Sequence, residues 1–327
     1  MSGVEAQTKL LDVKGLRAYF RMGKGALRAV DGVDFGLDYG EALGIVGESG
    51  CGKTTSALSI CRMLPREGYI AGGEIFVEGI DYARLSDDEI RAHRWKDVSI
   101  IFQGAMNAMN PVKRVGFQIA EAIELHEGAD RKAAMNRAGD LLELVEIPRD
   151  RLSRYPHEFS GGMKQRAMIA MALACGAKLV IGDEPTTALD VMIQAQILDL
   201  LERLRRERRM GLILITHDLS ILGETCDRIA VMYAGKIVET GTVRDVFDRA
   251  AHPYTRRLIS CFPRIGGEKV VPEGIDGFPP NLIDPPRGCR FHPRCLEARA
   301  ACREIEPQTR RLSATHSVAC HLAEVKS

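Results

Sequence analysis

Nine consecutive residues between positions 47 and 55 have the types and spacing of a phosphate-binding site. They read Gly-Glu-Ser-Gly-Cys-Gly-Lys-Thr-Thr, which fits a glycine, four residues and then Gly-Lys-Ser/Thr. Glycines let the backbone turn N–H groups toward phosphate oxygens, and Lys53 brings a charge to the β- and γ-phosphates. The Thr54 hydroxyl suits Mg²⁺, and Thr55 can reach the α-phosphate. We therefore predict a nucleoside triphosphate site made of Gly47, Glu48, Ser49, Gly50, Cys51, Gly52, Lys53, Thr54 and Thr55.

Polar side chains also follow three apolar runs that read as buried strands. Gln103, the pair Asp183 and Glu184, and His217 each stand at the end of such a run. The first carboxylate could hold Mg²⁺ through water, and the second could orient or deprotonate an attacking water. The imidazole could donate to a γ-phosphate. Taken singly, each residue would favour a structural role, which for the acidic pair is a helix N-cap.

A second anion site is predicted where Ser-Gly-Gly-Met opens an apolar helix. Exposed N–H groups at a helix start favour negative charge, although the same residues also form ordinary caps and linkers. Asp190 is predicted to begin a further helix over residues 191–208. The residues of the second anion site are Ser160, Gly161, Gly162 and Met163.

The elements that would position these groups indicate an α/β domain. Alternating apolar residues predict strands from Leu10 to Leu37, and a helix is predicted from Lys53 to Leu64. From Pro111 to Cys175 the periodicity is helical without a strong strand, which predicts a helical insertion. Tyr19 and Phe20 end the first strand, where either could stack on an adenine or simply be a core or edge aromatic.

Composition narrows the class of protein. The 327 residues are 45% apolar and 27% charged, as in an ordinary soluble globular protein, and the net charge of +1 gives no support to a nucleic-acid binder. The apolar stretch 167–177 is shorter than the roughly 18 to 20 residues that span a bilayer. The first residues lack the pattern of a secretory signal. The nine cysteines are therefore expected in a reducing cytoplasm.

The sequence beyond residue 250 predicts an irregular extension that carries a metal site. Proline and glycine recur there, and His252-Pro-Tyr-Thr opens a short helix. Four cysteines lie in a polar segment, separated by five, six and seventeen residues. Such a group indicates metal ligands, with reduced structural thiols as the alternative. The predicted ligands are Cys289, Cys295, Cys302 and Cys320.

A [4Fe–4S] cluster suits these cysteines better than zinc. Structural zinc sites favour cysteine pairs two to four residues apart, and this segment has none. A four-thiolate cluster tolerates wider spacing and is anionic, which nearby arginines would suit. Those arginines are Arg287, Arg290, Arg294 and Arg303, while His292, His316 or His321 could replace a cysteine.

In their order along the chain, these motifs resemble the ATP-binding cassette (ABC) family over about residues 10–250. The resemblance implies a RecA-like phosphate-loop core with an antiparallel β subdomain and an α-helical subdomain inserted at about 104–175. It also implies that Phe20 stacks on adenine, with Tyr19 as the fallback, and that Ser160 to Met163 are the signature loop.

The resemblance further assigns roles to the groups at the strand ends. Gln103 senses Mg²⁺ and water, Asp183 is linked to the metal and Glu184 is the catalytic carboxylate. Asp190 makes a contact across a dimer, and His217 is the switch. Met163 in place of the usual glutamine, and a glycine at position 182, depart from the pattern. Neither removes a charged group, so a competent ATPase is expected.

The sequences Phe-Ser-Gly-Gly-Met, His-Pro-Tyr-Thr and Gly-Cys-Arg-Phe-His-Pro-Arg-Cys resemble the ATP-binding subunits of bacterial dipeptide and oligopeptide importers. Methionine in the signature is similar to the first of their two paired ATPase subunits. The resemblance implies a nucleotide-binding domain at 1–250 and a transporter-type extension at 251–327. It implies two transmembrane permeases, a second homologous cassette and, indirectly, an extracytoplasmic peptide-binding protein, at the cytoplasmic face of the inner membrane.

Two other functions are weighed against import. A soluble cassette ATPase of DNA or ribosomes would usually carry a very long coiled coil or two tandem cassettes, and neither appears in this sequence. In an iron–sulfur sensor, ATP would be regulatory. The importer family also handles nickel chelates and glutathione, so the class of solute stays open.

Overall fold

The computed structural model describes residues 9–23, 25–104, 109–187, 189–261 and 274–323. The chain divides into two compact units. Unit 1 contains Met1–Leu11, Leu37–Glu41 and Phe76–Ile215, and unit 2 contains Asp12–Gly36, Ala42–Ile75 and Thr216–Ser327.

Three parallel strands form the sheet of unit 1. They are β6 (Val98–Ile101), β7 (Leu179–Asp183) and β8 (Gly211–Ile215), with β7 in the middle. Every residue of β7 and β8 is buried, as expected for short apolar runs in a parallel sheet. A two-residue strand, β5 (Ile80–Asp81), pairs antiparallel with the end of β4.

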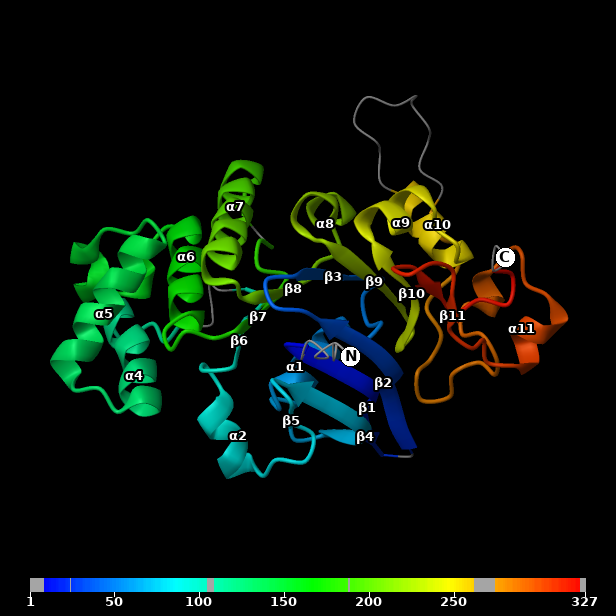
Figure 1. The fold of residues 1–327 in the computed structure, drawn as a ribbon, viewed down its shortest axis with the longest axis horizontal. Helices are drawn as coiled ribbons and strands as arrows, with labels where there is room; N and C mark the ends of the chain where they lie inside the picture. The colour runs from blue at the N-terminus through cyan, green and yellow to red at the C-terminus, as the bar shows by residue number, and fades with distance from the viewer. Residues whose placement is uncertain (1–8, 24, 105–108, 188, 262–273, 324–327) are drawn as a thin grey trace, which may run out of the picture. The chain divides into compact units, whose positions relative to one another are not determined.

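A cluster of helices in unit 1 follows β6 in the chain. Figure 1 shows α4, α5 and α6 side by side. Asp130 caps α5 by accepting hydrogen bonds from two backbone N–H groups, and leucines 141 and 142 are buried on its apolar stripe. The helical periodicity thus correctly predicted the secondary structure here. The helical elements of the unit are α2 (Asp87–His93), α4 (Val115–Glu127), α5 (Arg131–Leu144), η1 (Arg149–Ser153), η2 (Pro156–Glu158), α6 (Gly161–Ala172) and α7 (Val191–Arg208).

Unit 2 contains two sets of strands. In one, β3 (Ala42–Val46) runs parallel to β9 (Arg228–Tyr233), and β9 pairs antiparallel with β10 (Lys236–Thr242). In the other, β1 (Leu11–Met22) lies between β2 (Gly25–Leu37) and β4 (Gly68–Val77).

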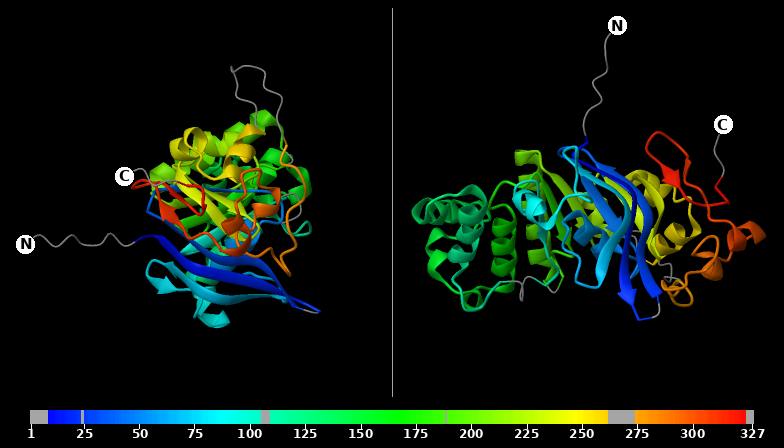
Figure 2. Two further views of the ribbon diagram at one scale, coloured as in Figure 1. Left: turned by 90° about the vertical axis from the view of Figure 1, so that its right-hand side faces the viewer. Right: turned by 90° about the horizontal axis from the view of Figure 1, so that it is seen from below.

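The C-terminal segment extends the first of these sheets. The short strand β12 (Ser317–Val318) pairs with β10, and β11 (Arg310–Arg311) pairs with β12. Figure 2 shows this red and orange segment beside the yellow helices α9 and α10. The segment therefore contributes backbone hydrogen bonds to a sheet of unit 2, which sequence analysis did not predict. The helical elements of the unit are α1 (Lys53–Ile60), α8 (Leu219–Thr225), α9 (Val243–Asp248), α10 (Pro253–Ser260), η3 (His292–Arg294) and α11 (Ala300–Glu304).

Helix α1 is shorter than the sequence predicted. It ends at Ile60 instead of Leu64, because Arg62 adopts a φ of 51° and Pro65 follows shortly after. The domain boundary at residue 250 stays a prediction. Among the described residues, no helix combines the length and apolar character needed to cross a membrane.

Candidate functional site

The phosphate loop joins β3 to α1 in unit 2, as the sequence predicted. Two of its glycines are required by close backbone contacts. A Cβ at Gly47 would lie 2.1 Å from the carbonyl oxygen of Met232, and one at Gly52 would lie 2.3 Å from that of Ala29. Gly52 also has a φ of 108°, which other residues rarely adopt. The loop is therefore packed tightly against two neighbouring segments of its own unit.

The ammonium group of Lys53 lies inside the loop. Its side chain is buried, and Nζ donates hydrogen bonds to the carbonyl oxygens of Gly47 at 2.7 Å and Glu48 at 3.1 Å. Thr54 is exposed and Thr55 is half-buried at the start of α1. The loop thus gathers a positive charge and the N-terminus of a helix, the two features that bind phosphate.

In unit 1, Gln103 and Glu184 are brought together after their strands. Gln103 Nε2 donates to Glu184 Oε2 at 2.7 Å, and the Thr187 hydroxyl donates to the same oxygen at 2.9 Å. Glu184 adopts a φ of 49°, and its N–H donates to Ile215 at 2.8 Å. Strained backbone of this kind is common at functional positions. The carboxylate is held in one orientation by two donors.

Asp183 is the buried last residue of β7. Close packing around the preceding residue explains why that residue is a glycine. A Cβ at Gly182 would lie 3.1 Å from the ring of Pro185 and 3.3 Å from Leu214. The turn after β7 folds back closely over this position. The departure from the family pattern at Gly182 is therefore compatible with a tightly packed strand end.

The signature residues open α6 as predicted. Ser160 Oγ accepts a hydrogen bond from the backbone N–H of Met163 at 3.3 Å, which makes Ser160 the N-cap. Ser160 is exposed, and Gly161 and Gly162 are half-buried. A Cβ at Gly162 would lie 2.8 Å from Ile193 of α7, so the two helix starts approach closely.

Asp190 caps the second of these helices. Its carboxylate accepts from the N–H of Ile193 at 3.0 Å, which confirms that it begins α7. The next two residues, Val191 and Met192, are 80% and 71% exposed. An apolar, unburied helix start beside the signature is a candidate contact surface.

Three other predicted site residues, Tyr19, Phe20 and His217, lie in unit 2 and differ in their burial and hydrogen bonds. The Tyr19 hydroxyl donates to Asp31 at 2.6 Å, and burial together with this hydrogen bond raises the Tyr19 pKa to about 12. Phe20 is half-buried, with its ring edge beside Gly68. His217 is exposed just after the buried Thr216. The roles of these three residues stay predictions.

Three residues that hold the predicted groups were not predicted from the sequence. Thr187 binds Glu184 as described, while Tyr254 and Arg294 bind Glu48 of the phosphate loop. The position of Arg294 within the cysteine motif marked it as a notable residue. Its positive charge was expected to balance the negative charge of the predicted cluster. In the structure, Arg294 pairs with Glu48 and Arg290 pairs with Asp31. The reason is that both guanidinium groups are buried, and a buried charge requires an opposite charge beside it.

The four predicted cysteine ligands are close enough to affect one another. Burial raises the pKa of Cys289 to about 11, and the charges of the other three cysteines contribute to this shift. The N–H of Cys289 also donates to the carbonyl of Cys302 at 2.8 Å. Across the described ranges, however, no group of three or more His, Cys, Asp or Glu side chains is arranged to hold a metal ion. The structure therefore does not confirm the [4Fe–4S] cluster.

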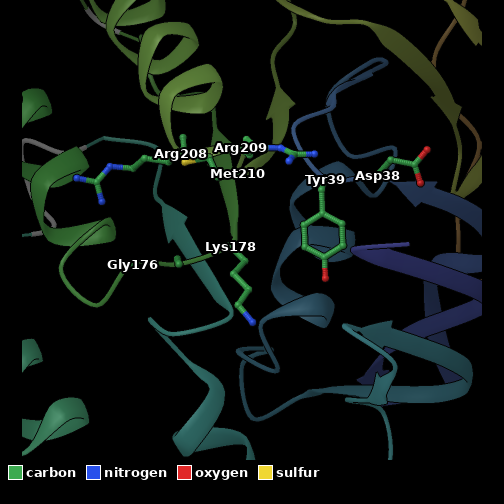
Figure 3. Close-up of a pocket in the computed structure, with 8 residues that line it drawn as sticks. Asp38, Tyr39, Gly176, Lys178, Arg208, Arg209 and Met210 are labelled. Atoms are coloured by element: carbon green, nitrogen blue, oxygen red, sulfur yellow. The ribbon is translucent and has the colours of Figure 1, made fainter. Parts of the chain in front are cut away.

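A surface cavity of about 800 Å³ in unit 1 contains none of the predicted site residues (Figure 3). Lys178 is paired with Glu78, and the Tyr39 hydroxyl donates to the same carboxylate. Lys178 and Tyr39 at this cavity thus have a structural partner in Glu78. It is lined by Asp38, Tyr39, Gly176, Ala177, Lys178, Arg208, Arg209 and Met210.

Comparison with known proteins places these motifs in one family. Residues 30–187 match the profile described as ABC transporter, and residues 238–302 match the oligopeptide/dipeptide transporter C-terminal region. The chain is 46% identical to a dipeptide transport ATP-binding protein of Haemophilus influenzae, with 95% of each chain covered. It is 47% identical to an oligopeptide transport ATP-binding protein of Bacillus subtilis, covering 95% of this chain and 88% of the relative.

Solved structures agree with this assignment. An ATP-binding cassette in a dimeric, post-hydrolysis state bound to ADP and Pi has a TM-score of 0.64 and 26% identity. The match covers 72% of this chain and 99% of that one. These relatives give no support to a DNA, ribosome or sensor function. The chain belongs to the ABC transporter family, among the ATP-binding proteins with the oligopeptide/dipeptide transporter C-terminal region.

Proposed function

We propose that this protein is the ATP-hydrolysing, energy-coupling subunit of a bacterial importer for dipeptides or oligopeptides. The relatives named for dipeptide and oligopeptide transport, which match nearly the whole chain, support this proposal. The observation that carries the chemistry is the fixed carboxylate of Glu184, whose Oε2 accepts from both Gln103 and Thr187.

The types of the proposed site residues suit hydrolysis of ATP. Lys53 and the N-terminus of α1 bind the β- and γ-phosphates, and Phe20 stacks on the adenine, with Tyr19 as the fallback. Glu184 orients and deprotonates the attacking water, and His217 contacts the γ-phosphate. The roles of these residues are proposals that rest on residue type, local geometry and the family resemblance.

A magnesium ion is expected with the nucleotide. The hydroxyl of Thr54, the carboxylate of Asp183 and the amide oxygen of Gln103 are of the hard oxygen type that Mg²⁺ prefers, and the family resemblance implies them as its ligands. Mg²⁺ would neutralise charge that develops on the phosphates. Gln103 would also sense the ion from its position beside Glu184.

A second cassette is needed to complete the proposed ATP site. The chain has one phosphate loop and one signature, so Ser160, Gly161, Gly162 and Met163 are proposed to serve the ATP of a homologous partner. Asp190 and the exposed start of α7 would contact that partner. Closure of the two cassettes on ATP would move two permease subunits, and hydrolysis would reset them.

Three further features belong to the proposal. The cassette would occupy residues 1–250 and the transporter-type extension 251–327. The protein would bind peripherally to the cytoplasmic face of the inner membrane and be supplied by an extracytoplasmic peptide-binding protein. The four cysteines would hold a [4Fe–4S] cluster, supported by their number and their spacing in the sequence.

Purification from native membranes in mild detergent tests the transport function. Two multispanning permeases, a second cassette and a peptide-binding protein should accompany the tagged chain. The ligand carried by that binding protein would identify the solute class. Recovery with ribosomal or DNA-associated proteins alone would overturn the import proposal while leaving the ATPase chemistry in place.

A further inference from the structure

The C-terminal extension reaches the phosphate loop through one buried arginine. Arg294, at the end of η3, has a side chain only 6% exposed. Its Nη1 donates to Glu48 Oε2 at 2.6 Å, and its Nη2 donates to Glu48 Oε1 at 2.9 Å. This is the two-pronged pairing that a planar guanidinium makes with a carboxylate. Arg294 and Glu48 are 246 residues apart in the sequence, yet both lie in unit 2.

The guanidinium of Arg294 has no donor left over. Besides the two bonds to Glu48, it donates to the backbone carbonyl oxygens of Ile275 at 3.0 Å and Asp276 at 2.8 Å and to the Tyr233 hydroxyl at 3.3 Å. These five bonds match the five N–H donors of an arginine side chain. The group is therefore fixed on both sides, by the extension itself and by β9. A lysine could not reproduce this arrangement.

Glu48 is held at its backbone as well as at its side chain. Its N–H donates to the Tyr254 hydroxyl of α10 at 2.9 Å. Its carbonyl oxygen accepts from Lys53 Nζ at 3.1 Å. One residue of the loop thus connects the phosphate-binding ammonium group to two side chains from beyond residue 250.

An aromatic cluster makes this connection rigid. The rings of Tyr233 and Tyr254 lie 4.6 Å apart, and Phe291 packs against both at 5.1 and 5.3 Å. All three side chains are at most 1% exposed. Because Phe291 is three residues before Arg294, the cluster sets where the guanidinium stands. A small cavity of about 20 Å³ between the loop and residues 279, 280 and 282 shows how closely the extension covers it.

We propose that Arg294 and Tyr254 are positioning residues for ATP, which hold Glu48 so that the phosphate loop and Lys53 keep the geometry that binds triphosphate. The extension is then part of the nucleotide site, in addition to any role in the transporter. This inference rests on the proposed ATP-binding role of the loop. Neither residue touches the nucleotide in this scheme, because both act through Glu48.

The test is equilibrium binding of a fluorescent ATP analogue with Mg²⁺ to the full chain. Arg294→Ala should raise Kd about tenfold, the equivalent of one lost charged hydrogen-bond pair, and Arg294→Lys should restore part of the affinity. In the assembled transporter, Arg294→Ala should raise KM for ATP by a similar factor and leave kcat within about twofold. A merely structural role would lower the melting temperature and the active fraction without this split between KM and kcat.

Matched variants locate the effect at Glu48. Arg256→Ala removes another arginine–glutamate pair of the same extension, in which the single nitrogen Nη2 donates to both carboxylate oxygens of the exposed Glu297, and should leave Kd unchanged. Arg294→Ala combined with Glu48→Ala should be no weaker than either single variant, because both remove one interaction. Tyr254→Phe deletes only the hydroxyl and should raise Kd about threefold, so it serves even where Arg294→Ala fails to fold.

Two results separate failure of this inference from failure of the proposed function. Lys53→Ala should weaken binding in every case, and unchanged affinity there would refute the phosphate-loop assignment itself. Weak binding by Lys53→Ala together with wild-type Kd in both Arg294→Lys and Tyr254→Phe would overturn the positioning role alone. Additive losses in the double variant would also overturn it.

Discussion

Gln103 and Glu184 are joined by a hydrogen bond of 2.7 Å between an amide nitrogen and a carboxylate oxygen, although 81 residues separate them in the chain. Parallel pairing of β6 with β7 brings their strand ends together, since Ile101 stands opposite Gly182. The pair therefore follows from the register of the sheet. The residue proposed to sense Mg²⁺ is therefore in direct hydrogen-bond contact with the proposed catalytic carboxylate.

Replacing Glu184 with glutamine should stop hydrolysis and keep binding. The substitution preserves size and an acceptor for Gln103 but removes the base, so ATP turnover should fall about 100-fold or more. The Kd for ATP should stay within about threefold, because the group acts in the transition state. Single-turnover hydrolysis and equilibrium binding measure the two effects. Glu121→Gln, at an exposed ion pair of the same unit, is the control, and normal turnover by Glu184→Gln would remove it from catalysis.

Adding a methyl group at Gly52 should destroy the phosphate loop. The new Cβ would meet backbone 2.3 Å away and require a φ of 108°, so both unit 2 and ATP binding should be lost in large part. Gly15→Ala is the matched control in the same unit but outside the phosphate loop, because Gly15 also has a positive φ, of 55°, and an added Cβ there would meet nothing within 4 Å. It should lower the free energy of unfolding by only about 1 to 2 kcal/mol. Circular dichroism on heating and ATP binding compare the two, and equal behaviour would contradict the packing argument.

The features predicted correctly from sequence are those that local residues determine. The phosphate loop needs glycines in order, and the helix starts at Ser160 and Asp190 need a short polar side chain beside its own N–H groups. Such patterns involve only three or four consecutive residues, so they can be recognised directly in the sequence. The helix ending at Ile60 shows the limit, because backbone geometry at Arg62 ended it early.

The features that sequence analysis missed depend on distant contacts. Arg294 was expected to suit the charge of a nearby metal cluster, while its partner in the structure, Glu48, lies near the other end of the chain. Pairing of Val318 with Glu239 likewise joins two remote segments, and two residues are too few to give a strand pattern. Charge and spacing indicate that a group needs a partner, but only the fold shows which partner it finds.

The cap of α7 should be measurable separately from any contact of Asp190 with a partner. Asp190→Ala removes the acceptor for the Ile193 N–H and should lower the free energy of unfolding by about 1 kcal/mol. Asp190→Asn keeps a good cap, so it should leave stability unchanged and alter ATP turnover only if the charge matters between cassettes. Amide hydrogen exchange at Ile193 and turnover in the transporter distinguish these effects. Asp199→Ala, exposed on the same helix, is the control, and equal exchange in Asp190→Ala would contradict the capping role.

His252 should make unit 2 sensitive to acid. Burial lowers its pKa from 6.5 to about 4, helped by the charge of Arg256 and opposed by Glu239. The unfolded chain therefore binds the proton more readily, so this stability is present above pH 6.5 and is lost as the pH falls toward 4. His252→Asn retains a cap for α10 and should flatten the difference in melting temperature between those pH values. His157→Asn, at an exposed site, should keep the wild-type slope, and a wild-type slope in His252→Asn would refute the assignment.

The four cysteines of the extension should bind iron and sulfide when the protein is purified without oxygen. A [4Fe–4S] cluster predicts brown protein with about four irons and four sulfides per chain. Cys295→Ser should lose most of this iron, while Cys261→Ser, a half-buried cysteine outside the motif, should retain it. Stoichiometric zinc without iron would reject the cluster in favour of a structural zinc site. Metal-free protein with wild-type ATP binding would instead identify the four residues as reduced thiols that pack the extension.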